Sequence, residues 1–172
     1  MSRPTSQPFA PSLDASPFRF ALIVSRFNEG ITSSLRRAAL KALLDRGAEN
    51  VQVFDVPGAY EIPQAARAAA ETGRFDAVVC LGCVVRGETP HFDYISSAVA
   101  HGIMTAAGDT GVPMAFGVLT TDTMEQASSR ARDGAEDNKG REAAHAAIEM
   151  AALYRTLGAM TPRGPGVAKP PG

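Results

Sequence analysis

Short apolar runs alternate with amphipathic helical stretches along most of this chain, and this alternation limits the possible folds more than any other feature. Strands separated by helices of about 10 to 20 residues are typical of right-handed βαβ crossovers, which place helices on both faces of a parallel sheet. The expected strands are residues 18–25, 51–56, 76–85 and 113–120, and the expected helices are residues 32–46, 62–72, 92–107, 124–133 and 138–157. We therefore predict an α/β fold, a flavodoxin-like three-layer αβα sandwich with a central four-stranded parallel sheet.

The length of 172 residues fits one domain with a substantial core. We expect that domain to cover residues 18–157. The first 17 residues contain four prolines, and the last 15 are rich in proline and glycine. Such compositions predict a flexible N-terminal segment, residues 1–17, and a disordered C-terminal tail, residues 158–172.

The charge of the chain is nearly balanced, with 17 Lys and Arg against 18 Asp and Glu, and the basic residues are scattered. This distribution does not predict a nucleic-acid partner. No apolar run approaches the ~20 residues that span a bilayer, and the N-terminal stretch has no apolar segment of signal-peptide type. We expect a cytoplasmic protein that is not inserted in a membrane.

Two cysteines, Cys80 and Cys83, have the spacing of a redox or zinc motif. Their surroundings, VVCLGCVV, are those of a strand, and residues three apart on a strand point to opposite faces. No second Cys or His pair is available to complete a zinc site. We interpret both cysteines as small core residues.

The loop after the third strand is the strongest candidate for a ligand site, because open α/β sheets bind ligands at the carboxyl ends of their strands. In this loop Gly87 exposes backbone N–H groups, Thr89 offers a hydroxyl, and the following helix start adds a positive dipole. These features favour an anion of phosphate type. The alternative is an ordinary helix start that Thr89 caps.

His91 follows this loop directly, within reach of a ligand held there, and an imidazole can give and take a proton near neutral pH. A lone histidine is more often structural, so both interpretations stay open on spacing alone. His101 and His145 fall inside expected helices without obvious polar company. We expect these two to be structural or surface residues.

Other strand ends and turns offer weaker candidates. Phe27 could stack on a planar ring or cover the core, and Glu61 could accept hydrogen bonds from a polyol or serve the next helix start. Arg130 and Lys139 are the cations that could meet a phosphate, although solvation is the usual fate of such residues.

Five ordered motifs carry a resemblance to a known family: SRFNE, VPGAYEIP, LGCVVRGETPHFDYI, FGVLTTDTMEQA and DNKG. Together they resemble the lumazine synthases of riboflavin biosynthesis, and the match runs over residues 18–157. The resemblance implies that 5-amino-6-(D-ribitylamino)uracil condenses with 3,4-dihydroxy-2-butanone 4-phosphate to 6,7-dimethyl-8-ribityllumazine, with release of phosphate and water. It implies no metal and no redox cofactor.

The resemblance also implies roles for particular residues, with His91 as the proton-transfer residue. The residues that would contact the pyrimidine substrate are Phe27, Ala59, Tyr60, Glu61, Cys83, Val84 and Val85. The residues that would hold the phosphate are Gly87, Glu88 and Thr89. Phe27 would act by stacking, Glu61 by accepting from ribityl hydroxyls, and residues 83–85 through their backbone.

The remaining contacts are expected from a neighbouring subunit, because Phe116 and Arg130 reach across an interface in this family, and Lys139 also lies near the ligand. The resemblance therefore implies a homo-oligomer, a pentamer or a multiple of pentamers. The link ARDGAEDN, residues 131–138, departs from the more compact link of shell-forming members. This departure counts against an icosahedral shell.

Two other functions compete with this one. A protein that binds flavin or lumazine without turnover would keep the pocket, although the presence of His91, Arg130 and Phe27 speaks against it. A flavodoxin-like phosphate-binding domain of unrelated function is what the pattern supports without the motifs.

Overall fold

A computed structural model describes residues 8–160 of the chain. The strands are β1 (Arg19–Ser25), β2 (Asn50–Val56), β3 (Ala77–Val85) and β4 (Met114–Thr121), and the helices are α1 (Glu29–Asp45), the short 3₁₀ turn η1 (Ala59–Glu61), α2 (Ile62–Glu71), α3 (His91–Thr110), α4 (Met124–Arg130) and α5 (Lys139–Ala159). None of the helices within the described range is long and apolar enough to cross a membrane.

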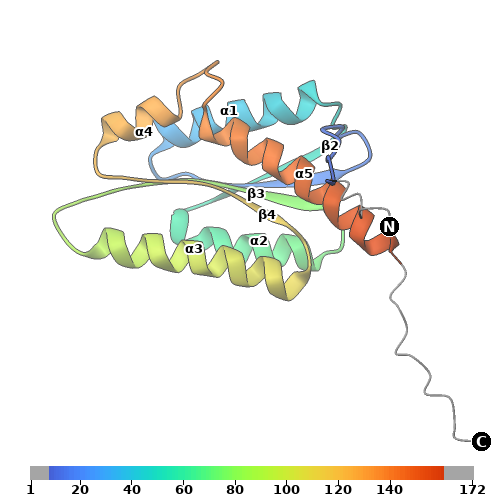
Figure 1. Cartoon of the computed structure of the whole chain (residues 1–172). Coiled ribbons are helices and arrows are strands. Elements are labelled where there is room, and N and C mark those ends of the chain that lie inside the picture. Colours follow the sequence, from blue (N-terminus) through green and yellow to red (C-terminus); the bar gives the residue numbers. More distant parts are fainter. Residues whose placement is uncertain (1–7, 161–172) are drawn as a thin grey trace, which may run out of the picture.

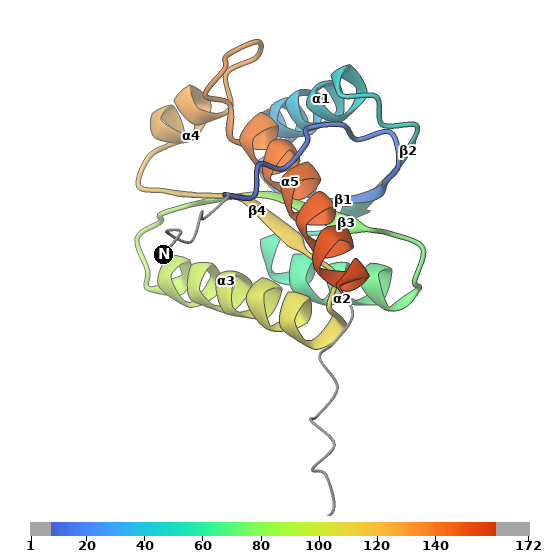
Figure 2. The same ribbon diagram turned by 45° about the vertical axis from the view of Figure 1, so that its right-hand side comes forward.

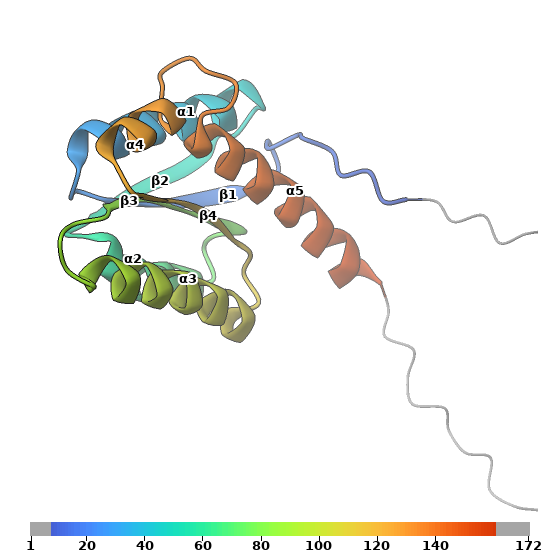
Figure 3. The ribbon, with the colours of Figure 1, turned by 60° about the vertical axis from the view of Figure 1, so that its left-hand side comes forward.

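The four strands form one sheet in the order β2-β1-β3-β4, and every pairing is parallel. Helices α1, α4 and α5 cover one face of the sheet, and α2 and α3 cover the other (Figures 1 and 3). Helix α5 crosses the sheet obliquely beside α1 (Figure 2). The predicted fold class, a three-layer αβα sandwich with a four-stranded parallel sheet, is confirmed.

Strand β3 is buried on both faces, as its unbroken apolar sequence predicts. Its residues alternate between two cores, with Cys83 in the core under α1 and α5 and Cys80 in the core over α2 and α3. Both cysteines are free thiols. The prediction that they are core residues on opposite faces is confirmed.

The N-terminal segment contacts the domain just before β1. Ala15 is fully buried and its N–H donates to the carbonyl of Arg46 at 2.8 Å, while the guanidinium of Arg155 lies over the ring of Phe18. The parts of the two expected tails at residues 1–7 and 161–172 lie outside the described residues.

Helices α1 and α5 pack tightly at Gly140, where an added Cβ would overlap the backbone of Leu35. Asn138, which is buried, fixes this helix start. Its side chain accepts a hydrogen bond from the N–H of Gly140 at 2.8 Å and donates one to the carbonyl of Arg132 at 3.0 Å. The start of α5 is therefore held by a cap and by a helix contact that only glycine permits.

We expect Gly140→Ala to lower the free energy of unfolding by about 1–3 kcal/mol, because the methyl group forces the two helix backbones apart. Gly158→Ala is the matched control on the same helix, since nothing lies within 4 Å of the Cβ that it adds. That change should be neutral or slightly stabilising, by about 0.4–1 kcal/mol. Urea unfolding followed by circular dichroism measures both, and equal stability of the two variants would contradict the close contact.

Candidate active site

A pocket of about 320 Å³ lies at the carboxyl ends of β1 and β3. These strands are neighbours in the sheet, and the chain leaves them toward β2 on one side and β4 on the other, so the pocket occupies the topological switch point where α/β sheets bind ligands. Its walls come from the loop after β1, η1, the end of β3, the loop after β3 and the first turns of α3. The lining residues are Phe27, Gly58, Ala59, Tyr60, Cys83, Val84, Val85, Gly87, Thr89, His91, Phe92 and Ile95.

Most of the residues that the sequence predicted for the pyrimidine and the phosphate line this pocket, but Glu61 and Glu88 do not. The carboxylate of Glu61 still lies beside the pocket, because a Cβ added at Gly58 would come within 3.1 Å of its Oε2 atom. A side chain larger than hydrogen at Gly58 would therefore press on Glu61. Gly58, Phe92 and Ile95 line the pocket without having been singled out from the sequence.

Two aromatic side chains stand at the pocket mouth with most of their surface open. Phe27 is 69% exposed and Tyr60 is 57% exposed. Aromatic rings of this size usually bury most of their apolar area, so exposed rings beside a pocket provide faces on which a planar ligand can stack. The pocket can thus receive a flat heterocycle.

The end of β3, residues Cys83, Val84 and Val85, lines the same pocket. The Nδ2 atom of Asn28 donates to the carbonyl oxygen of Cys83 at 2.9 Å, which ties the loop that carries Phe27 to β3. Asn28 has φ = 58°, the only positive φ of a non-glycine residue between residues 8 and 160. Asparagine tolerates this left-handed conformation better than most residues.

The thiols of Cys83 and Cys80 are buried on opposite faces of β3. Burial raises the pKa of Cys83 to about 11, and that of the deeper Cys80 to about 12. Thiols with such pKa values stay protonated at neutral pH and are poor nucleophiles. Neither cysteine is suited to covalent catalysis.

The loop between β3 and α3 presents an open helix start. Pro90 occupies the N-cap position of α3, and no side chain caps this end of the helix. The alternative in which Thr89 caps the helix is therefore not observed. The N–H of Asp93 donates to the carbonyl of Pro90 at 3.0 Å, which leaves the N–H groups of His91 and Phe92 open to an anionic ligand.

His91 is the first residue of α3, and its exposed side chain lines the pocket. Its imidazole makes no hydrogen bond to another residue of the described chain, which leaves both ring nitrogens open to a ligand. His101 is exposed farther along α3 and does not line this pocket. His145 lies on α5, where burial and the charges of Arg141 and Arg46 lower its pKa.

Phe116, Arg130 and Lys139 lie together in a different hollow, of about 260 Å³, along β4. This hollow and the pocket share no lining residue. Arg130, at the end of α4, donates from Nη1 to the carbonyl of Gln126 at 3.0 Å, and Lys139 pairs with Glu142 at 2.7 Å. The chain does not bring these three residues to His91.

Comparison with known proteins assigns the chain to a family. The family model described as 6,7-dimethyl-8-ribityllumazine synthase matches residues 17–155. The chain belongs to the 6,7-dimethyl-8-ribityllumazine synthase family. The resemblance that the five motifs carried is thereby confirmed.

Two curated members of the lumazine synthase family illustrate the similarity, and both bear the name 6,7-dimethyl-8-ribityllumazine synthase. The protein from Salinibacter ruber (strain DSM 13855 / M31) is 58% identical over 141 residues, covering 81% of this chain and 90% of that protein. The protein from Syntrophus aciditrophicus (strain SB) is 54% identical over 147 residues, covering 84% of this chain and 95% of that protein. The similarity therefore extends over nearly the whole of both relatives.

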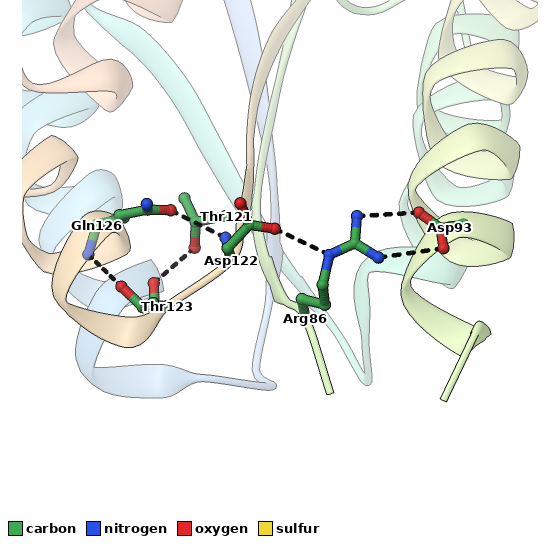
Figure 4. Close-up of polar contacts among 6 residues, drawn as sticks. All are labelled: Arg86, Asp93, Thr121, Asp122, Thr123 and Gln126. Carbon is green, nitrogen blue, oxygen red and sulfur yellow. Dashed lines mark hydrogen bonds and ion pairs between the residues drawn. The ribbon is translucent and has the colours of Figure 1, made fainter. Parts of the chain in front are cut away.

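Sequence reasoning about this lumazine synthase family member missed Arg86, which lies between β3 and the loop from Gly87 to His91, here called the anion loop. Figure 4 shows its guanidinium between Asp93 and Asp122. These carboxylates raise the pKa of Arg86 further above its ordinary value. The signal was present, since RGETPHFD carries the arginine and one of its partners seven residues apart. The arrangement was not evident from the sequence because its carboxylate partners come from two different elements, the first turn of α3 and the turn between β4 and α4.

Within the described part of the chain, no group of three or more His, Cys, Asp or Glu side chains gathers to hold a metal ion. The pocket instead combines stacking faces, backbone hydrogen-bonding groups, an open helix start and one imidazole. That set suits the binding of a flat heterocycle beside an anion, with proton transfer between them.

Proposed function

We propose that the protein condenses 5-amino-6-(D-ribitylamino)uracil with 3,4-dihydroxy-2-butanone 4-phosphate to 6,7-dimethyl-8-ribityllumazine, with release of phosphate and water. The observation that carries this proposal is the pocket in which Phe27, the end of β3, the anion loop and His91 meet. Membership of the family supplies the reaction, and the pocket supplies the groups that it needs.

The chemistry requires positioning and proton transfer. The primary amine of the pyrimidine attacks the ketone carbon, and loss of one water gives a Schiff base. Elimination breaks the carbon–oxygen bond to the phosphate group, and the ring closes with loss of a second water. Phe27 would hold the ring by stacking, the loop at Gly87 and Thr89 would hold the phosphate, and His91 would move protons between the two substrates.

We also propose that each active site is completed by a second copy of the chain. None of the described residues that line the pocket is a lysine or an arginine, yet the substrate carries a phosphate. Arg130 and Lys139 lie with Phe116 in the separate hollow, so a head-to-tail contact between copies would bring cations to the anion loop. Repeated contacts of this kind close into a ring, in keeping with the expected pentamer or multiple of pentamers.

A single assay tests the proposed reaction. Purified protein is mixed with both substrates, and the absorbance and fluorescence of the lumazine product are followed against a control without protein, because the amine also condenses without help. We expect turnover well above that control. Folded, assembled protein that binds flavin without forming product would favour the competing hypothesis of a non-catalytic binder.

A further inference from the structure

Arg86 is the residue that ties the anion loop to its surroundings. Its Nη1 and Nη2 atoms donate to the two carboxylate oxygens of Asp93 at 3.2 Å and 3.1 Å, and its Nε donates to Oδ1 of Asp122 at 2.8 Å (Figure 4). The guanidinium also lies 4.3 Å from the ring centroid of Phe92, which lines the pocket. Arg86 thus contacts two carboxylates and one pocket wall.

The ion pair between Arg86 and Asp93 connects the residue before the anion loop to the helix turn after it. Arg86 stands directly before Gly87, and Asp93 lies in the first turn of α3, two residues after His91. The side chains of residues 87–92 make no hydrogen bond to any other residue between positions 8 and 160. A two-point Arg–carboxylate contact fixes distance and orientation together, so this pair defines the shape of the loop.

The contact with Asp122 anchors the closed loop to β4. The N–H of Arg86 donates to the carbonyl of Thr121 at 2.8 Å, which holds the loop start at the sheet. Asp122 is itself fixed, because its N–H donates to Oε1 of Gln126 at 2.9 Å (Figure 4). Arg86 therefore attaches the loop to two rigid elements, α3 and the β4–α4 turn.

The charge around Arg86 argues against a role as the main cation for the phosphate. Two carboxylates surround one guanidinium, so the group has a formal charge of −1 in total. Three of the donor positions of Arg86 already serve carboxylate oxygens. A group arranged in this way holds a loop better than it attracts an anion.

We propose that Arg86 is a positioning residue: through Asp93 and Asp122 it holds the loop from Gly87 to His91 in the shape that receives the phosphate of the substrate. This inference rests on the proposed function for its substrate, but not for the contacts that it explains. The ion pairs are exposed, so they should contribute little to global stability. Their effect should be local to the loop.

The variant Asp93→Asn separates positioning from direct anion binding. If Arg86 itself bound the phosphate, removing the nearby negative charge would strengthen binding and lower the KM for the four-carbon phosphate. If Arg86 acts by closing the loop, the same variant should raise that KM by about tenfold, the effect of losing about one charge-assisted contact. The KM for the pyrimidine should stay unchanged in either case.

Arg86→Lys keeps the positive charge and removes the planar two-point contact. We expect it to resemble Arg86→Gln, with a raised KM for the phosphate substrate and a kcat that changes less. Arg67→Gln is the matched control, because Arg67 is similarly exposed and also bridges two carboxylates, Glu71 and Asp109, away from the pocket. This control should keep wild-type kinetics.

Hydrogen exchange of the backbone amides of Arg86, Asp93 and Tyr94, whose N–H groups donate to carbonyls at the two ends of the loop, tests the inference without any turnover. Exchange should be faster by about tenfold in Asp93→Asn and in the Arg86 variants than in the wild type and in Arg67→Gln. A wild type that lacks turnover would refute the proposed function and leave this readout intact. Unchanged exchange in these variants, or a lower KM in Asp93→Asn, would overturn the positioning role.

Discussion

Replacement of His91 by alanine is expected to lower kcat by about 10²- to 10⁴-fold, the range that proton transfer by a positioned side chain contributes. His91 lines the pocket at the first position of α3, and its imidazole is not engaged by other residues of the described chain. Binding of the pyrimidine should largely survive, because the stacking faces and the end of β3 remain. Some turnover should persist, since the amine condenses with the phosphate sugar unaided.

Steady-state kinetics together with calorimetric binding of the pyrimidine check this expectation. His101→Ala is the control, because His101 is exposed on the same helix and lies outside the pocket. It should leave both kcat and binding unchanged. A His91→Ala variant with the wild-type kcat would remove His91 from the mechanism and leave positioning alone.

Replacement of Arg130 by alanine is expected to lower kcat/KM for the four-carbon phosphate by about 10²-fold, as the loss of two charge-assisted hydrogen bonds would do. Arg130 lies in the hollow along β4 and not in the pocket that holds His91. Within one chain, Arg130 is not at the pocket, so its own chain does not explain a large loss of kcat/KM. It follows directly if a neighbouring copy supplies Arg130 to the site.

Mixed oligomers of His91→Ala and Arg130→Ala test this arrangement. If each site takes its pocket from one copy and Arg130 from the next, random assembly leaves about one interface in four with both residues intact. Co-expression of the two variants should therefore restore about a quarter of the wild-type activity from two nearly inactive parents. Mixed oligomers as inactive as their parents, or a stable monomer in sedimentation, would contradict the shared site.

The fold could be predicted from the sequence because local signals and tertiary packing agree. Gly47 and Gly73 follow the ends of α1 and α2 with φ values of 88° and 67°, as expected for helix-terminating glycines. The apolar run of β3 predicted a strand buried on both faces. Because side chains alternate between the faces of a strand, Cys80 and Cys83, three residues apart, were expected in different cores, where the structure places them. These features are set by residues that are close together in the sequence, so the order of residue types is enough to predict them.

Several helix ends were less well predicted. Helix α1 begins at Glu29 rather than Thr32, because Asn28 adopts a left-handed conformation and turns the chain directly into the helix. Helix α3 extends to Thr110, three residues beyond the expectation, and ends at Gly111 with φ = 69°. Both ends depend on backbone conformations that composition does not reveal.

The candidate site could be predicted only in part. The loop that follows β3 was found because strand ends collect ligands, but the link of Arg86 to Asp122 joins positions 36 residues apart. The separation of Phe116, Arg130 and Lys139 from the pocket is likewise a property of the folded sheet. Motif order cannot show which members of a site lie on the same side of a strand.

The placement of the two ends of the described chain has a practical consequence. The residues just before β1 and the last turn of α5 lie at the end of the sheet where the strands begin (Figures 1 and 3). The pocket lies at the opposite end, where β1 and β3 finish. A solid support or a label attached at the residues before β1 or at the last turn of α5 would meet the domain on the side opposite to the pocket. Immobilised preparations should accordingly keep substrate access.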